Sequence, residues 1–446
     1  MEEALLTVKD LLKNKQYADL RLFLQDMEPY DISCILEEMP EEKLPLIFRI
    51  LPKETAAETF VEMDSDLQEL LISSFNDREL TEMLDELYVD DMVDIIEEMP
   101  ANVVKRILKS SDAETRLLIN GILQYPKDSA GSLMTTEYVR LRRKMTVGEA
   151  FVHIRRTGVD KETIYTCYVT DDDKRLQGLV TAKDLLLANE DDVIGDIMET
   201  KIIFATTLED QESVAEKLQK YDFLALPVVD MEQRLVGIIT IDDAIDVMEQ
   251  EATEDIEKMA AIMPTDKPYT KMGVLETYRK RMPWLLVLML SATFTSLIIE
   301  GFESALALVP ILNAFIPMLT GTGGNAGGQA SVAIIRSLSL KEIEYRDVPF
   351  IIWKEVRVAF CCGLTLGGVC FVKLLLEGKD VLTAGVVGIT VACAVVMAKF
   401  VGCMLPIAAQ RVGFDPAVMA SPLITTVVDA LTLLIYFEIA SIAFGL

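Results

Sequence analysis

The chain is almost devoid of histidine, and that absence limits its chemistry. Among 446 residues there is one histidine, His153, and there are two tryptophans. Zinc sites built on several histidines and histidine-dependent catalysis are therefore excluded. The seven cysteines form no Cys-x-x-Cys pair and five lie in apolar segments, which indicates thiols used for packing in a reducing compartment. No constellation of residues indicates an enzyme.

Basic residues are scarce relative to acidic ones, and the imbalance is confined to one half. The chain has 42 Lys and Arg against 71 Asp and Glu, a formal net charge of −29. From residue 271 onward 13 basic and 12 acidic residues nearly cancel, so the first 270 residues carry a net −30. This charge argues against nucleic acid as a partner, which requires basic patches, and favours cations. The sequence thus predicts an acidic soluble half followed by an apolar half.

The acidic half contains two internal repeats. The first pairs Ile35–Pro40 with Ile95–Pro100, near copies that each close a helix at a proline. Residues 1–130 are therefore predicted to be short helices, stacked as a superhelix or packed as an ordinary bundle. The second repeat pairs Gly178–Asp184 with Gly237–Asp243, each preceded by a strand and a polar turn and followed by a helix.

The Gly-x-x-Thr-x-x-Asp pattern of the second repeat resembles the signature of a CBS (cystathionine β-synthase) domain. Two copies predict tandem CBS domains over 131–190 and 191–250. In that family the Thr and Asp often hold the ribose and phosphates of an adenosine nucleotide, so the resemblance makes Gly178, Thr181 and Asp184 candidate nucleotide-binding residues, with ATP as the ligand. Many such pairs bind no nucleotide, and that alternative stays open.

Residues 242–282 are predicted to be an acidic linker helix, running to about Met263, and an amphipathic stretch that ends in Arg279–Arg281. A transmembrane domain of five helices is predicted over 283–446. The expected spans are 283–299, 305–335 (interrupted), 354–376, 381–409 and 416–444. Basic residues precede the first, third and fifth spans, which predicts a multi-pass protein of the cytoplasmic membrane with its N-terminus cytoplasmic and its C-terminus external.

A glycine-rich run, 319–330, lies inside the second span. One interpretation is a broken helix whose exposed backbone groups line a cavity. The other is a bend of small residues that lets helices approach closely. No Gly-Lys-Ser/Thr follows, so the run is not a phosphate loop.

Asp429 lies inside the last span, where a carboxylate costs roughly 2.5–3.5 kcal/mol on insertion scales. Such a residue usually faces a water-filled path or an ion. Ser421, Thr425 and Asp429 recur at steps of four and share a helix face, which offers only oxygen ligands and suits a hard cation. The alternative is a carboxylate held by a neighbouring helix, for example by Lys399.

Two motifs carry a family resemblance: Thr-Gly-Gly-Asn-Ala-Gly, and Ser-Pro-Leu-Ile-Thr-Thr followed three residues later by Asp. With these motifs, the order of the parts resembles the MgtE family of magnesium channels over essentially the whole chain. The resemblance implies a homodimer in the lipid bilayer with a pore on its two-fold axis. It implies that the fifth helix lines the pore and that Asp429 binds hydrated Mg²⁺. It also implies that cytosolic Mg²⁺ binds between the front domain, the CBS pair and the linker, called the plug helix, and closes the pore.

The resemblance also assigns the regulatory Mg²⁺ ligands, all of them acidic. They are Glu58, Asp90, Asp91, Asp94, Glu212, Asp222, Asp243, Asp246, Glu251, Glu254 and Asp255. Carboxylates brought together without cations repel one another, whereas Mg²⁺ bound between them makes the net interaction attractive. The alternative is a merely solvated acidic surface.

We therefore expect a multidomain, dimeric, Mg²⁺-gated Mg²⁺ channel. Its rivals are a divalent-cation carrier with alternating access and a membrane-anchored adenosine-nucleotide sensor without transport.

Overall fold

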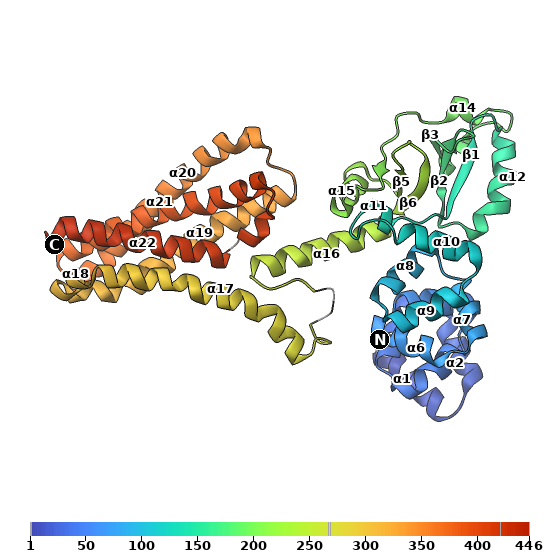
Figure 1. Ribbon diagram of the computed structural model, residues 1–446, viewed down its shortest axis with the longest axis horizontal. Helices are drawn as coiled ribbons and strands as arrows, with labels where there is room; N and C mark the ends of the chain where they lie inside the picture. The colour runs from blue at the N-terminus through green and yellow to red at the C-terminus, as the bar shows by residue number, and fades with distance from the viewer. Residues whose placement is uncertain (1, 266, 268, 420, 446) are drawn as a thin grey trace. The chain divides into compact units, whose positions relative to one another are not determined.

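The computed structural model describes residues 2–265, 267, 269–419 and 421–445. It divides into two compact units, Met1–Met248 and Glu249–Leu446 (Figure 1). Each unit is described by itself.

The first unit begins with a stack of short helices, which confirms the helical front domain. They are α1 (Glu2–Lys13), α2 (Tyr17–Gln25), α3 (Pro29–Glu37), η1 (Glu41–Lys43), α4 (Leu44–Phe48), α5 (Lys53–Val61), α6 (Ser65–Ser74), α7 (Asp77–Leu84), α8 (Val89–Glu98), α9 (Ala101–Ser110) and α10 (Ala113–Ile122). Every second helix makes contact, α3 with α5, α5 with α7 and α7 with α9. Prolines begin several helices: Pro29 occupies the first turn of α3, and Pro100 caps α9.

Two small sheets of the same topology follow, which confirms the CBS pair. The strands are β1 (Tyr138–Arg142), β2 (Thr163–Thr170), β3 (Leu176–Thr181), β4 (Ala205–Thr206), β5 (Ala225–Val229) and β6 (Leu235–Thr240). The accompanying helices are α11 (Ala130–Leu133), α12 (Val147–Thr157), η2 (Gly158–Asp160), α13 (Ala182–Leu187), α14 (Ile194–Ile197) and α15 (Gln211–Tyr221). In each sheet the first strand pairs parallel with the second and the second antiparallel with the third.

The repeated glycine of the two sheets is explained by close packing. A Cβ on Gly178 would lie 2.6 Å from Met198 Sδ, and one on Gly237 would lie 2.7 Å from Met134 Sδ. In both cases a neighbouring backbone oxygen lies within 3 Å as well. Each glycine therefore lets another segment of chain cross its strand; that segment follows Gly178 in the chain but precedes Gly237.

The linker helix α16 (Ile241–Met259) continues directly from β6. It is shorter than the predicted helix, which was expected to reach about Met263. The chain leaves the helix because Ala261 adopts a left-handed conformation (φ 55°) and the Ile262 amide donates back to the Glu257 carbonyl over 2.9 Å.

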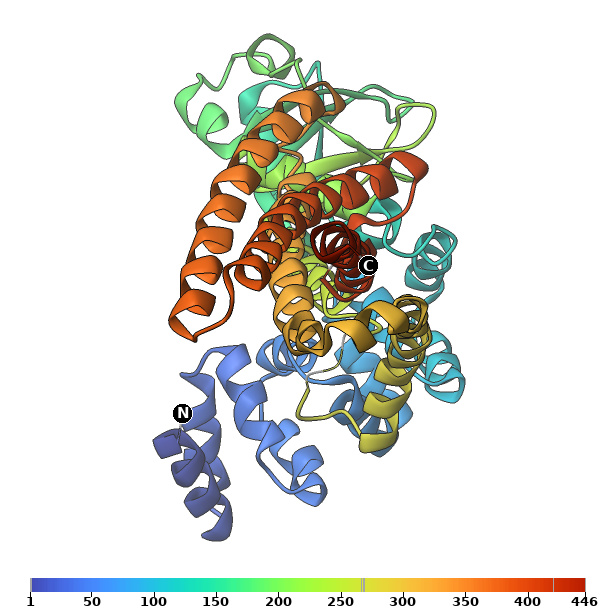
Figure 2. The same ribbon diagram turned by 90° about the vertical axis from the view of Figure 1, so that its left-hand side faces the viewer.

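The second unit is a bundle of long apolar helices (Figure 2). Its core is formed by α19, α20, α21 and α22. Its elements are α17 (Val274–Gly301), α18 (Glu303–Leu308), η3 (Pro310–Phe315), α19 (Ile316–Ser339), η4 (Tyr345–Asp347), α20 (Val348–Leu376), α21 (Val381–Val412), η5 (Pro416–Met419) and α22 (Ser421–Phe444). Within the described residues, four helical segments are long and apolar enough to span a membrane: Val274–Gly301, Val348–Leu376, Val381–Val412 and Pro416–Phe444. The remaining expected span, the second (305–335), corresponds to α19, a 24-residue helix that its glycines make less apolar.

The broken-helix interpretation of the glycine run is wrong. Helix α19 is continuous from Ile316 to Ser339, and the interruption lies before it, in η3. The glycines instead form the face against α21 and α22. A Cβ on Gly323 would lie 2.8 Å from Thr432 Oγ1, and a Cβ on Gly402 would overlap the carbonyl oxygen of Gly327. Small residues here allow three helices to pack closely, the alternative that the sequence left open.

Candidate cation sites

Carboxylates from three parts of the first unit gather into one group, called here the acidic cluster. Its members are Asp90, Asp91, Asp94, Glu137, Glu162, Asp242 and Asp243. Helix α8 of the helical domain supplies three, the residues just before β1 and β2 supply two, and the first turn of α16 supplies two. Four of the seven were assigned as metal ligands from the resemblance.

Mutual repulsion and burial raise the proton affinity of the α8 carboxyls. Burial, and then the charge of Asp243, raises the pKa of Asp91 to about 6. The same two causes in the same order raise the pKa of Asp94 to about 7, although its side chain reaches the surface. Burial, followed by the charge of Asp91, raises the pKa of Asp90 well above its ordinary value. Its Oδ1 is enclosed and has no hydrogen-bond partner among the described residues.

The carboxyls of the CBS pair behave in the same way. Burial, followed by Asp242 and Asp243, raises the pKa of Glu162 to about 7. Burial also raises the pKa of Asp243 to about 6, against a hydrogen bond of 2.5 Å that its Oδ2 accepts from Thr240 Oγ1. Within the part of the chain that the structure describes, no Lys or Arg is among the main influences on the pKa of these carboxyls, which favours the binding of protons or cations there.

The spacing of the cluster suits a hydrated cation better than a naked one. Among the residues that the structure describes, no three carboxylates or thiols stand close enough together to hold a metal ion directly. Mg²⁺ dehydrates reluctantly and commonly keeps several waters, binding through one or two carboxylates. The donor set of the cluster, which is oxygen only, fits this ion.

Sequence reasoning missed Glu137, Glu162 and Asp242. The pairing of β1 with β2 brings the first two together: Tyr138 is the register partner of Thr163, and the Glu162 amide donates to the Glu137 carbonyl over 2.9 Å. An acidic residue directly before each of two parallel strands was the available signal, because such residues share one sheet edge.

Some of the assigned regulatory residues lie away from the cluster. The pKa of Glu58 is raised by burial and then by Glu54 and Glu28, not by cluster members. Glu212 lies in the first turn of α15 and Asp222 follows its end, and neither is among the main influences on the cluster carboxyls.

Asp246 stands one turn along α16 from the acidic cluster. It raises the pKa of Glu62 of the helical domain, after burial, and contributes to the raised pKa of Asp243. Glu62 was not foreseen from the sequence. The interaction of Glu62 with Asp246 shows that the helical domain and the linker helix approach each other outside the acidic cluster as well.

The acids of the second half of α16 have partners within the second unit. Glu254 Oε1 lies 2.5 Å from Lys258 Nζ, and Asp255 Oδ2 accepts a hydrogen bond of 2.9 Å from Ser339 Oγ. Glu251, one turn earlier, also makes an interaction. Unlike the acidic cluster, this group contains a cation of the protein itself.

Asp429 lies half-buried in the middle of α22, and its Oδ1 is enclosed without a hydrogen-bond partner among the described residues. Lys399 is buried on α21, yet within the described chain no ion pair joins it to Asp429, which disfavours the alternative raised from the sequence. Thr425 lies one turn before Asp429 and packs against Gly324 of α19. The side chain of Ser421 is outside the described residues.

The candidate nucleotide residues of the first repeat form a helix cap. Thr181 Oγ1 donates to Asp184 Oδ2 over 2.6 Å and accepts from the Asp184 amide over 3.2 Å. Thr240 and Asp243 make the corresponding hydroxyl contact in the second repeat. The motif therefore begins a helix in both repeats, whatever else it does.

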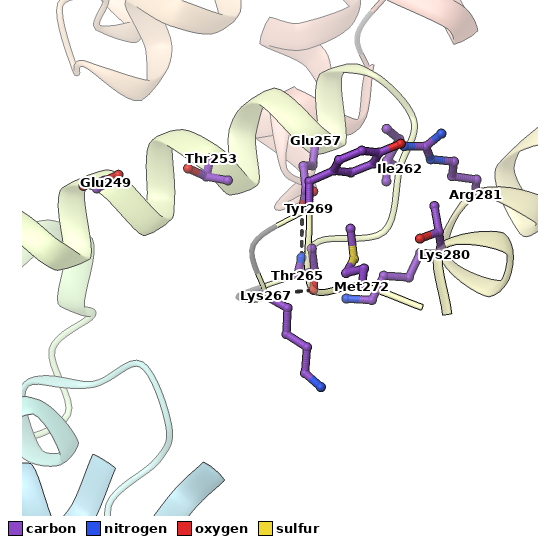
Figure 3. Close-up of a pocket in the computed structure, with 11 residues that line it drawn as sticks. Glu249, Thr253, Glu257, Ile262, Thr265, Lys267, Tyr269, Met272, Lys280 and Arg281 are labelled. Carbon is purple, nitrogen blue, oxygen red and sulfur yellow. Dashed lines mark hydrogen bonds between the residues drawn. The ribbon is translucent and has the colours of Figure 1, made fainter. Parts of the chain in front are cut away.

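A pocket of about 360 Å³ lies between the second half of α16, the chain after it and the first turns of α17 (Figure 3). Glu257 Oε2 accepts from the Thr265 amide over 2.8 Å at its edge. Lys280 and Arg281, from the basic stretch predicted to anchor the first span, also line the pocket. The guanidinium of Arg281 stands 5.8 Å from the ring centre of Tyr269.

Comparison with known protein families places each part of the chain. A family model described as a divalent cation transporter, MgtE, matches residues 316–439. The MgtE intracellular N domain matches residues 27–128, and the CBS domain matches 130–191 and 194–250.

Full-length relatives are magnesium transporters. The chain is 38% identical over 445 residues to magnesium transporter MgtE of Thermus thermophilus, covering 99% of this chain and 98% of that protein. It is 33% identical over 440 residues to magnesium transporter MgtE of Bacillus subtilis, covering 99% and 97%.

Solved structures resemble the first unit. The cytosolic domain of the Mg²⁺ channel MgtE in complex with ATP matches with a TM-score of 0.52 and 36% identity, covering 55% of this chain and 99% of that one. The soluble part of a magnesium transporter matches with a TM-score of 0.53 and 30% identity, covering 56% and 99%.

Proposed function

Because the chain belongs to the MgtE family of magnesium transporters, we propose that it is a Mg²⁺-selective channel of the cytoplasmic membrane that cytosolic Mg²⁺ closes. The observation that carries the pore assignment is Asp429: a carboxylate in the middle of an apolar helix, with one oxygen enclosed and unpaired among the described residues. Such a group is costly in a membrane unless a cation compensates it.

Two copies of the chain complete the pore in this proposal. Around a two-fold axis, two α22 helices supply two Asp429 carboxylates for one hydrated Mg²⁺, with Thr425 and Ser421 one and two turns before them. The exposed amides Asn325 and Gln329, one turn apart on α19, support a polar surface that a partner copy or a water path covers. The N-terminus is then cytoplasmic and the C-terminus external.

The acidic cluster is the proposed sensor. Without Mg²⁺ its carboxylates oppose the contact between the helical domain and the start of α16. Bound Mg²⁺ removes this repulsion and stabilises the compact, closed state by RT ln(1 + [L]/Kd) for each site. Asp90, Asp91, Asp94 and Asp243 act here, together with Glu137, Glu162 and Asp242. In the rest of the first unit, Glu58, Glu212, Asp222 and Asp246 are weaker candidates for further Mg²⁺ contacts.

ATP is the proposed ligand of the CBS pair. The related cytosolic domain that was crystallised with ATP supports this ligand. Thr181 and Asp184 stand at the start of α13, with Gly178 on the strand before it, where a nucleotide could meet both side chains. Titration of the full-length chain with ATP should give heat that Asp184→Ala abolishes.

The pore is tested by Asp429→Asn, which keeps size and removes charge. Mg²⁺ flux into liposomes containing the full chain should fall by about tenfold or more, and preference for Mg²⁺ over monovalent ions should be lost. Glu438→Gln, at an exposed position nine residues further along α22, is the matched control and should be mild. Unchanged flux and selectivity in Asp429→Asn would contradict the pore assignment.

The carrier remains the rival for the transport step. Single-channel currents decide between the two, because a carrier turns over too slowly to produce resolved openings. A nucleotide sensor without transport would show no flux in the same liposomes.

A further inference from the structure

One lysine joins the linker helix to the chain that leads into the pore helix. Lys258, in the last turn of α16, places its Nζ 2.5 Å from Glu254 Oε1 and 2.7 Å from Asp415 Oδ2. Asp415 directly precedes η5, the short turn before α22. The three side chains are only 24–36% exposed, so water screens this pairing less than it screens a surface ion pair.

Neighbouring contacts fix the same junction from both sides. Asp255 is held by the Ser339 hydroxyl at the end of α19. Met259 packs against Ile335 of α19 and Ala417 of η5. The second carboxylate oxygen of Asp415 also has a partner, because Oδ1 accepts a hydrogen bond of 2.8 Å from the Ala417 amide. One carboxylate thus orders η5 with one oxygen and binds the linker with the other.

We propose that Lys258 is a positioning residue for gating, an internal cation that locks the end of the linker helix to the segment from which the pore helix starts. The inference rests on the proposed function, since it concerns how closure reaches the pore. Asp415 stands 14 residues before Asp429 on the same stretch of chain, so displacement of the linker displaces the base of α22.

This role differs from that expected for the linker acids from the family resemblance. Glu254 and Asp255 were assigned as Mg²⁺ ligands, but here an ammonium group and a hydroxyl hold them. The Lys258 ammonium group is covalently attached, so it is present at this junction at any Mg²⁺ concentration. Mg²⁺ dependence then arises mainly at the acidic cluster, where no Lys or Arg of the described residues is a main influence on the carboxyls.

Lys258→Met tests the lock, because it keeps the apolar stem and removes the charge. In liposomes with the full chain, the internal Mg²⁺ concentration for half closure should rise about fivefold. This is the change in an equilibrium constant that follows from losing one ion pair whose free energy is at the upper end of the usual range for such pairs. Asp415→Asn should do the same, since Asn retains the acceptor for the Ala417 amide. Lys267→Met, at an exposed lysine of the same linker, is the control and should leave closure unchanged.

The exchanged pair Lys258→Asp with Asp415→Lys supplies the decisive comparison. Asp415→Lys alone loses the acceptor for the Ala417 amide and sets two lysines together. The exchanged pair restores the attractive contact with Glu254 still beside it, so its closure should need clearly less Mg²⁺ than that of Asp415→Lys alone. A merely structural role for Lys258 predicts no such rescue. Unshifted closure in Lys258→Met, or no recovery in the exchanged pair, would overturn the lock.

Amide hydrogen exchange tests the Lys258 lock independently of whether the chain transports Mg²⁺. In the full-length chain in detergent, amides of residues 256–262 should exchange about fivefold faster in Lys258→Met, while those of residues 241–248 should not change. If wild-type liposomes show no flux, the proposed function fails, and the exchange result still decides the lock. Equal exchange in both proteins would exclude it.

Discussion

The two CBS repeats carry the same motif and the same hydrogen bond between the Thr hydroxyl and the Asp carboxylate, yet their aspartates occupy different electrostatic surroundings. Asp184 and Asp243 each accept from the hydroxyl of the threonine three residues before, over 2.6 and 2.5 Å. Asp184 lies in the first turn of a six-residue helix and is exposed. Asp243 begins the 19-residue linker helix and faces α8, where burial raises its pKa to about 6.

The comparison shows that the motif itself specifies only a helix start. Its local hydrogen bonds are satisfied in both repeats, so the difference comes from what packs outside the motif. In the second repeat the helical domain brings Asp91 and Asp94 toward Asp243. In the first repeat the corresponding aspartate stays at the surface, open to a ligand.

Neutralising the two aspartates in parallel should separate these roles most strongly. Asp243→Asn keeps the threonine contact but removes one charge from the acidic cluster, so it should weaken the Mg²⁺ response. We expect about a tenfold rise in the internal Mg²⁺ needed for half closure, the factor for one lost charge contact. Asp184→Asn should leave that concentration unchanged. Similar shifts in both variants, measured by liposome flux, would break the comparison.

A pH series should give the next largest effect. In the folded chain Asp91 and Asp243 have pKa values of about 6, and Asp94 and Glu162 of about 7, above ordinary values near 4. Between about pH 4 and 7 the folded state thus binds more protons than the unfolded state, and its stability falls as pH rises. In EDTA the circular-dichroism melting temperature should fall by several degrees from pH 5.5 to 8.

Saturating Mg²⁺ is the internal control for that series, since the metal takes the place of the protons. It should raise the melting temperature most at pH 8 and least at pH 5.5. An Mg²⁺ effect that is the same at both pH values would indicate a solvated acidic surface rather than a sensor.

The smallest expected effect is the loss of each helix cap. Thr181→Ala and Thr240→Ala should each lower the free energy of unfolding by about 1 kcal/mol, the usual value of an N-cap. Only Thr240→Ala should also change Mg²⁺ dependence, because its hydroxyl opposes the rise in the pKa of Asp243. Chemical denaturation with and without Mg²⁺ measures both the loss of stability and the change in Mg²⁺ dependence. Identical Mg²⁺ dependence in the two variants would contradict the difference between the repeats.

Local patterns in the sequence predicted much of the architecture. Proline-closed helices, the repeated Gly-x-x-Thr-x-x-Asp and the apolar runs specified short helices, paired small sheets and long helices, because each depends on neighbours within a few residues. The same locality made Asp429 recognisable, since a carboxylate in an apolar helix stands out without any knowledge of the fold.

Tertiary structure decided what those residues meet. The glycines of α19 read equally well as a break or as a contact face, and only packing against Thr432 and Gly402 made them a face. Glu137 and Glu162 join the acidic cluster through the register of β1 and β2, and Lys258 reaches Asp415 across more than 150 residues of sequence. Burial and Coulomb interactions depend on distance in space, so sequence spacing alone could not reveal which acids share a cluster and which already hold a lysine.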